Sequence, residues 1–257
     1  MTKAVILAGG LGTRFGSETA LRPKPLIEVG GRPVLWHIMK LYEYHGIYDF
    51  IICTGYRTEV IADFFLNYRS RFSDLDIDLV NGTVRVLRPP AENWRVKIID
   101  TGPLTATGGR LKRVAPLVAI DEYFLLTYGD TLTNVDVSGS IAYHRSHGRW
   151  ATMSVVSPQN RFGKVTIEDG VIVEYREKQL ESPLQLNAGF FVLSPKVFSY
   201  IDNDTTVWED GPLEQLARDR QLMAWRHEDF WQPMDTAVER DRLNRLWETG
   251  QAPWRVW

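Results

Sequence analysis

The sequence predicts an α/β fold in which a mixed, mostly parallel sheet is flanked by helices. Three observations support this prediction. Strand and helix patterns alternate through the first two thirds of the chain, which is typical of a parallel sheet. The first apolar run ends abruptly in a glycine-rich loop. After Trp150 the pattern shifts toward strands followed by two helices, which predicts a small β-rich and helical C-terminal part.

The N-terminal elements follow from local patterns. Residues 4–8 are an apolar run bounded by Gly9 and predict a strand. The apolar residues of 33–45 recur at helical spacing, and this segment opens on a proline and ends before Gly46, as helices commonly do. Residues 50–54 are a continuous apolar run and predict a second buried strand.

The middle of the chain continues the alternation of strands and helices. Residues 76–87 hold Asn81-Gly82 between two short runs, which is a strong signal for a β-hairpin. The other expected elements here are helices at 59–68 and 138–147 and strands at 96–100 and 123–127.

The C-terminal third predicts strands at 151–156, 164–167, 171–176 and 189–193, and helices at 212–219 and 236–248. Asp169-Gly170 marks the turn between the second and third of these strands. The sequence contains no internal repeat and no low-complexity segment. We therefore expect one domain that spans residues 1–257.

Composition narrows the class of protein. The 257 residues are 44% hydrophobic with a formal net charge of −2, which suits a full core and provides no basic face for nucleic acid. Apolar stretches are shorter than the roughly 20 residues of a membrane helix, and no signal-peptide pattern precedes the first strand. The single cysteine, Cys53, is expected to be a small buried residue. We expect a cytoplasmic protein without nucleic-acid or membrane partners.

The loop after the first strand predicts a triphosphate site. It comprises Leu7, Ala8, Gly9, Gly10, Leu11, Gly12, Thr13 and Arg14, and Pro23-Lys24-Pro25 follows it. Glycines let backbone N–H groups approach phosphates, because a Cβ atom would block the approach. Arg14 and Lys24 add positive charge where phosphate oxygens would lie. A glycine-rich turn with incidental charges is the plainer alternative.

Two commoner phosphate-binding loops do not fit this segment. The chain has no Gly-Lys-Ser or Gly-Lys-Thr, which a P-loop requires. Within residues 10–16, the third glycine comes one position later than in the dinucleotide-binding fingerprint. A hydride-transfer enzyme is therefore disfavoured.

The loop and Pro23-Lys24-Pro25 together resemble the signature of the sugar-1-phosphate nucleotidyltransferases. The resemblance continues through residues 36–40, 100–102, 107–113, 128–130, 187–193 and 230–236. It is strongest to members that transfer a cytidylyl group from CTP to α-D-glucose 1-phosphate. It implies a Rossmann-like enzyme with a nucleotide-binding core at 1–150 and a sugar-binding and C-terminal portion at 151–257. In the family, the product CDP-glucose feeds nucleotide-sugar and surface-polysaccharide pathways.

The resemblance also implies the reaction. A sugar 1-phosphate attacks the α-phosphorus of the triphosphate in line and displaces pyrophosphate, so the site needs positioning and positive charge but no protein nucleophile. Arg14 suits the leaving β- and γ-phosphates, and Lys24 suits the α-phosphate and the sugar phosphate. Mg²⁺ is implied as the cofactor, held by Asp130 and Asp235. For Asp235, capping of the last helix is the plainer alternative.

Further binding residues are implied by the same resemblance. Thr105 and Arg110 are expected to donate hydrogen bonds to the cytosine, with Gly108 and Gly129 beside the nucleotide. The residues expected at the sugar phosphate are Tyr128, Glu177, Lys178, Asn187 and Gly189. Gln179 and Ala188 depart from the family pattern, which has proline and glycine there, so a different sugar 1-phosphate or pyrimidine triphosphate stays open.

Three tryptophans near the C-terminus, Trp247, Trp254 and Trp257, are too many for a short tail to bury. We expect them to pack against another subunit, which makes the protein a homo-oligomer.

The sequence supports two other functions less well. A glycosyltransferase of similar architecture usually shows Asp-x-Asp, and the segment 130–132 lacks the second aspartate. A nucleotide-binding sensor without activity would normally have lost a phosphate or metal ligand, whereas Arg14, Lys24, Asp130 and Asp235 are all present.

Overall fold

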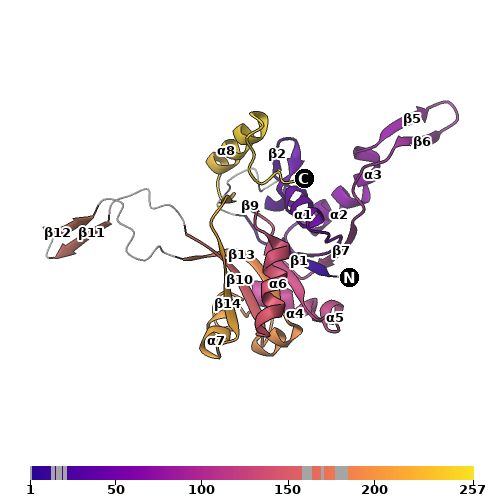
Figure 1. Cartoon of the computed structure of the whole chain (residues 1–257). Helices are drawn as coiled ribbons and strands as arrows, with labels where there is room; N and C mark the ends of the chain where they lie inside the picture. The colour runs from indigo at the N-terminus through magenta and orange to yellow at the C-terminus, as the bar shows by residue number, and fades with distance from the viewer. Residues whose placement is uncertain are drawn as a thin grey trace.

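A central sheet organises the molecule (Figure 1). The computed structural model describes residues 2–12, 15, 19, 22–157, 164–168, 171–176 and 185–257. Seven of the described strands form this sheet in the order β14 (Leu222–His227), β10 (Ala151–Val156), β13 (Leu186–Leu193), β8 (Phe124–Tyr128), β1 (Lys3–Leu7), β4 (Asp49–Thr54) and β7 (Arg95–Asp100). β1 runs parallel to β4 and β8, whereas β13 runs antiparallel to β8 and β10. The predicted mixed, mostly parallel sheet is confirmed.

Alternating side chains give the sheet two buried faces. In β1, Ala4 and Ile6 point into one hydrophobic cluster, and Val5 and Leu7 point into the other. The helices that pack on the first face are α1 (Val34–Tyr44), α2 (Thr58–Leu66), α3 (Tyr68–Arg71), α6 (Val137–His147) and α8 (Ala237–Glu248). Those on the second face are α4 (Thr107–Arg113), α5 (Ala115–Val118), η3 (Pro195–Tyr200) and α7 (Pro212–Arg218). Cys53 is fully buried on this second face, as expected.

Among the described residues, four short strand pairs lie outside the central sheet. They are β2 (Glu28–Val29) with β3 (Arg32–Pro33), β5 (Asp74–Asp78) with β6 (Thr83–Arg88), β9 (Thr131–Thr133) with β15 (Trp231–Pro233), and β11 (Lys164–Glu168) with β12 (Val171–Arg176). The hairpin β5–β6 is the one predicted around Asn81-Gly82, and Figure 1 shows it projecting far from the sheet. A short helical turn, η2 (Lys24–Leu26), follows the glycine-rich loop.

The structure differs from the sequence prediction in several elements. Among those that were not predicted are α4, α5, η3 and the short strands β2, β3, β9 and β15. The predicted helix at 59–68 ends at Leu66, and a separate short helix begins at Tyr68. Strand β14 was not predicted at all. It forms an edge of the sheet by pairing with β10, and its mixture of apolar, charged and histidine side chains lacks a clear alternation.

The C-terminal tryptophans pack within the chain itself. Trp254 is 1% exposed, and its ring lies against those of Phe230, Trp247 and His37. The expectation that Trp254 needs a second subunit to cover it is therefore wrong. The C-terminal tail packs against α1. Trp254 is therefore covered by residues that lie more than 200 positions earlier in the chain. Among the described residues, no helix is both long and apolar enough to cross a bilayer.

Histidine 37 makes the stability of this region depend on pH. Its Nε2 lies 2.8 Å from the carbonyl of Val29, and its Nδ1 lies 3.3 Å from the indole nitrogen of Trp254, which donates to it. Burial lowers the pKa of His37 from 6.5 to about 4. The unfolded chain therefore takes up this proton first as the pH falls.

We predict that the free energy of unfolding falls between pH 6.5 and 4 and that His37→Gln reduces this slope. Glutamine can still donate to the Val29 carbonyl but does not titrate. His144, whose pKa is lowered to about 4 mainly by burial, accounts for part of the remaining slope. Urea unfolding at a series of pH values measures the effect. Equal slopes for wild type and variant would contradict the assignment.

Candidate active site

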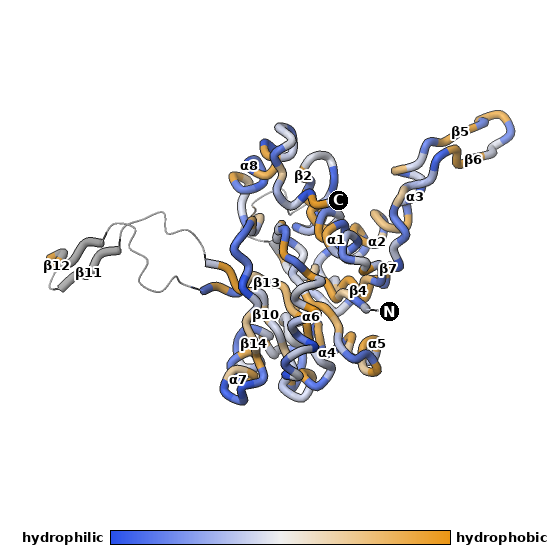
Figure 2. Tube along the Cα trace, viewed as in Figure 1, coloured by the Kyte–Doolittle hydropathy of each residue, from blue (hydrophilic) through white to orange (hydrophobic). Residues whose placement is uncertain are grey.

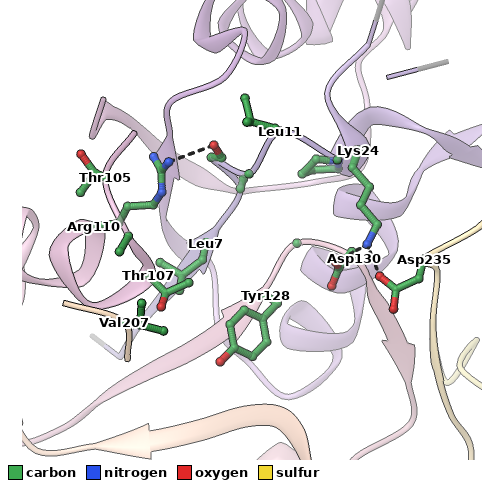
Figure 3. A pocket seen from close by; sticks show the side chains of 17 residues that line it. Leu7, Leu11, Lys24, Thr105, Thr107, Arg110, Tyr128, Asp130, Val207 and Asp235 are labelled. Atoms are coloured by element: carbon green, nitrogen blue, oxygen red, sulfur yellow. Dashed lines mark hydrogen bonds and ion pairs between the residues drawn. The ribbon is translucent and has the colours of Figure 1, made fainter. Parts of the chain in front are cut away.

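A cavity of about 520 Å³ opens at the carboxyl ends of β1 and β8 (Figure 3). From β1 the chain proceeds to β4 on one side, and it later returns to β8 on the other. Such a reversal of strand order leaves a crevice in which open α/β sheets bind ligands. The predicted site residues that line the cavity are Leu7, Ala8, Gly9, Gly10, Leu11, Gly12, Lys24, Thr105, Arg110, Tyr128, Gly129, Asp130 and Asp235.

The floor of the cavity, where the glycine-rich loop begins, is bonded to the sheet. The Gly129 N–H donates to the Leu7 carbonyl at 3.0 Å, which joins the ends of β1 and β8. A Cβ atom on Gly9 would lie 2.1 Å from Nη1 of Arg110, so a larger residue here would displace the Arg110 guanidinium. The glycine is thus needed for a close protein contact, in addition to the predicted approach to phosphate.

Arg110 ties the loop to two neighbouring strands. Its guanidinium donates to the carbonyls of Gly9 (3.0 Å), Thr54 (2.8 Å) and Gly102 (2.8 Å). The side chain is 5% exposed, and burial lowers the pKa of Arg110. In this arrangement Arg110 braces the wall of the cavity. Its predicted contact with the base, like that of Thr105, stays a prediction.

Lys24 lies at the opposite side of the cavity, between two carboxylates (Figure 3). Its ammonium donates to Oδ2 of Asp130 at 2.5 Å and to Oδ1 of Asp235 at 2.7 Å. The lysine side chain is 11% exposed and each aspartate side chain 29%. The backbone of Lys24 is flanked by prolines, which restrict its conformation.

Asp235 does not cap α8, so the alternative that this residue serves as the helix cap is wrong. Thr236 is the N-cap residue, and it forms a capping box with Glu239. The Asp235 N–H donates to the Glu239 carboxylate at 2.6 Å. The capping box therefore fixes the backbone of Asp235 and leaves its carboxylate facing Lys24.

The two aspartates have the chemistry of a magnesium site. Carboxylate oxygens are the hard donors that Mg²⁺ prefers. Across the part of the chain that the structure describes, no cluster of three or more His, Cys, Asp or Glu side chains is present to hold a metal. Asp130 and Asp235 would hold such a cation together with phosphate oxygens and water.

Tyr128 leads to a residue that sequence reasoning missed. Its hydroxyl donates to Oε1 of Glu209, and Thr107 donates to Oε2 of the same carboxylate at 2.6 Å. Burial, with Glu209 as the next cause, raises the pKa of Tyr128 above its ordinary value. Glu209 lies in an irregular segment 81 residues from Tyr128, and no local motif marks it.

The remaining predicted residues lie outside the cavity or outside the described residues. Asn187 and Gly189 lie on β13 beside Tyr128. Gly108 does not line the cavity. A Cβ atom there would lie 2.7 Å from the Thr206 carbonyl, so the small residue allows α4 to pack closely on the segment that contains Thr206. Thr13, Arg14, Glu177, Lys178 and the atypical Gln179 fall outside the described residues. Lining residues that were not predicted are Pro25, Ala106, Thr107 and Val207.

Comparison with known sequences identifies near relatives over the full chain. The family model described as nucleotidyl transferase matches residues 3–231. A glucose-1-phosphate cytidylyltransferase of Salmonella typhi is 49% identical over 255 residues and covers 99% of both chains. A probable glucose-1-phosphate cytidylyltransferase of Bacillus subtilis is 43% identical over 256 residues, covering 99% of this chain and 100% of the relative.

Solved structures show the same fold at lower identity. A putative glucose-1-phosphate thymidylyltransferase from Bacillus anthracis superposes with a TM-score of 0.67 and 21% identity, covering 98% of this chain and 96% of that one. An apo UDP-glucose pyrophosphorylase superposes with a TM-score of 0.68 and 15% identity, covering 98% of this chain and 100% of that one. At such identities the likeness supports the architecture alone.

We predict that Lys24→Met destabilises the fold by about 1–3 kcal/mol, because it leaves two partly buried carboxylates facing each other. Millimolar Mg²⁺ should recover part of this loss, since a cation bound only by the folded state stabilises it. Urea unfolding with and without Mg²⁺ measures both effects.

Arg218→Met is the control for this prediction. Arg218 pairs with Glu214 on α7 and both side chains are more than half exposed, so its loss should cost less than about 1 kcal/mol and show no response to Mg²⁺. Equal losses in both variants, or an equal Mg²⁺ response, would contradict the assigned site.

Proposed function

The chain belongs to the nucleotidyl transferase family, and from this premise we propose that it transfers the cytidylyl group of CTP to α-D-glucose 1-phosphate. The products are CDP-glucose and pyrophosphate. The main support for the proposal is the 49% identity, over 99% of both chains, to a relative named as a glucose-1-phosphate cytidylyltransferase. The Lys24 ammonium lies between two carboxylates at a cavity lined by a glycine-rich loop, and this arrangement has the chemistry that the reaction needs.

The mechanism rests on charge and position. The sugar phosphate supplies its own nucleophilic oxygen, so no protein nucleophile is required. Two anions must approach each other, and Lys24 reduces their repulsion when its ammonium turns from the carboxylates to the phosphate oxygens. Asp130 and Asp235 would then hold Mg²⁺, which when bound neutralises charge on the triphosphate. Arg14 is assigned to the leaving pyrophosphate by the family resemblance.

The two substrates are assigned to opposite ends of the cavity. Residues 1–150 are assigned to the nucleotide. The loop after β1 and Gly129 lie beside it, and Thr105 and Arg110 lie beside its base. Residues 151–257 contribute to the sugar end, where Asn187 and Gly189 lie next to Tyr128. Glu177 and Lys178 complete this end in the proposal. A cytoplasmic location accords with a nucleoside triphosphate substrate and a single buried thiol.

Self-association is a further part of the proposal, and the hairpin β5–β6 supports it. Leu79 and Val80 at its tip are 88% and 92% exposed, and Ile77, Val84 and Leu87 are also exposed. Figure 2 shows hydrophobic stretches in orange on this projecting hairpin. An isolated two-stranded hairpin is marginally stable in water, and exposed apolar clusters mark contact surfaces. We assign this arm to contact with a second copy of the chain.

We predict that pyrophosphate release with Mg²⁺ and glucose 1-phosphate is fastest with CTP among CTP, UTP, dTTP, ATP and GTP. The preference should exceed about tenfold, because a site that hydrogen-bonds one base leaves polar groups unpaired with another. A coupled pyrophosphate assay measures all five in parallel. A preference for another triphosphate would retain the reaction class and overturn the assignment of CTP, whereas no turnover with any of the five would overturn the proposed function.

We also predict that the wild-type protein sediments as an oligomer and that Leu79→Asp with Val80→Asp shifts it to a smaller species. Charges in an apolar contact oppose association. Val238→Asp on α8, which is 75% exposed and distant from the hairpin, is the control and should leave the assembly intact. A wild-type mass equal to one 29.5 kDa chain at every concentration would contradict self-association.

A further inference from the structure

The segment 203–211 is bound to the first turn of α4 on one wall of the cavity. The Ala106 N–H donates to the Asp204 carbonyl at 2.8 Å, and the Trp208 N–H donates to the Thr107 hydroxyl at 2.9 Å. Trp208 is fully buried, so the segment is anchored in the core. Its attachment places Glu209 within reach of both sides of the cavity.

Glu209 joins two walls of the cavity without lining it. One carboxylate oxygen accepts from Thr107, the first residue of α4, at 2.6 Å. The other accepts from the hydroxyl of Tyr128, the last residue of β8. Thr107 and Tyr128 both line the cavity. A single carboxylate thus sets the distance between the helix and the strand end.

The ring of Tyr128 is confined on another side by β13. Gly189 has φ +81°, and a Cβ atom there would lie 2.7 Å from Cδ2 of Tyr128. The ring therefore packs directly on the backbone of Gly189, and its hydroxyl is held by Glu209. Because the hydroxyl donates its proton to Glu209, the phenol oxygen presents only acceptor capacity to a ligand.

We propose that Glu209 is a positioning residue for the sugar 1-phosphate and that it acts through Tyr128. The inference rests on the proposed function. Glu209 fixes the tyrosine as a hydrogen-bond acceptor for a sugar hydroxyl at the end of the cavity away from the base. Without Glu209 the hydroxyl loses its acceptor, and the side chain keeps only its contacts with Gly189 and Asn187. The consequence falls on binding of the sugar phosphate more than on binding of CTP.

Steady-state kinetics of Glu209→Ala test this role. The KM for glucose 1-phosphate should rise about tenfold, which corresponds to 1.4 kcal/mol, and the KM for CTP should change less than about threefold. Glu209→Gln should stay within about threefold of wild type, because its amide oxygen accepts from Tyr128 and its amide nitrogen donates to Thr107. Glu214→Gln is the control: Glu214 pairs with Arg218 on the exposed face of α7.

A double-mutant cycle with Tyr128→Phe identifies the route of the effect. If Glu209 acts through the tyrosine hydroxyl, Glu209→Ala adds little to the KM change of Tyr128→Phe. Additive changes, or equal rises in both KM values, would overturn the inference and indicate a general structural role. Should Glu209→Ala fail to fold, an unchanged KM for glucose 1-phosphate in Tyr128→Phe alone would overturn it. An inactive wild type would instead overturn the proposed function.

Discussion

Lys24 joins three parts of the chain that are far apart in sequence. Its ammonium binds Asp130, 106 residues away at the end of β8, and Asp235, 211 residues away before α8. Two ionised carboxylates that face one site repel each other, and the ammonium between them offsets this repulsion. In the proposed reaction, the ammonium becomes available to phosphate when a divalent cation takes its place on the carboxylates. The ion cluster would thus couple the position of Lys24 to the binding of a metal-bound nucleotide.

The other walls of the cavity depend on buried polar side chains. Arg110 holds the glycine-rich loop to the ends of β4 and β7, and Glu209 holds α4 to the end of β8. Each of these groups is bonded on several sides, which limits its movement. A site that must bring two anions together benefits from such walls, since positioning is most of what the protein contributes.

Local patterns predicted β1, β4 and α1, because these are apolar segments with clear ends, but they did not predict α4, which forms a wall of the cavity. The family signature located Lys24, Asp130 and Asp235. The sequence did not predict the partners of Arg110, the role of Glu209 or the burial of Trp254. Arg110 bonds to Gly9 across 101 residues, and Trp254 bonds to His37 across 217. Contacts of this kind arise from tertiary packing, which periodicity and propensity do not contain.

The most direct test of the central role of Lys24 is the turnover of Lys24→Ala with CTP, glucose 1-phosphate and Mg²⁺. We expect a loss of about 10²–10³ in rate, because a positioned charge is removed from the transition state. Lys97→Ala, which removes a lysine remote from the cavity, should retain wild-type turnover. Undiminished turnover in Lys24→Ala would contradict the mechanism, whatever its effect on stability.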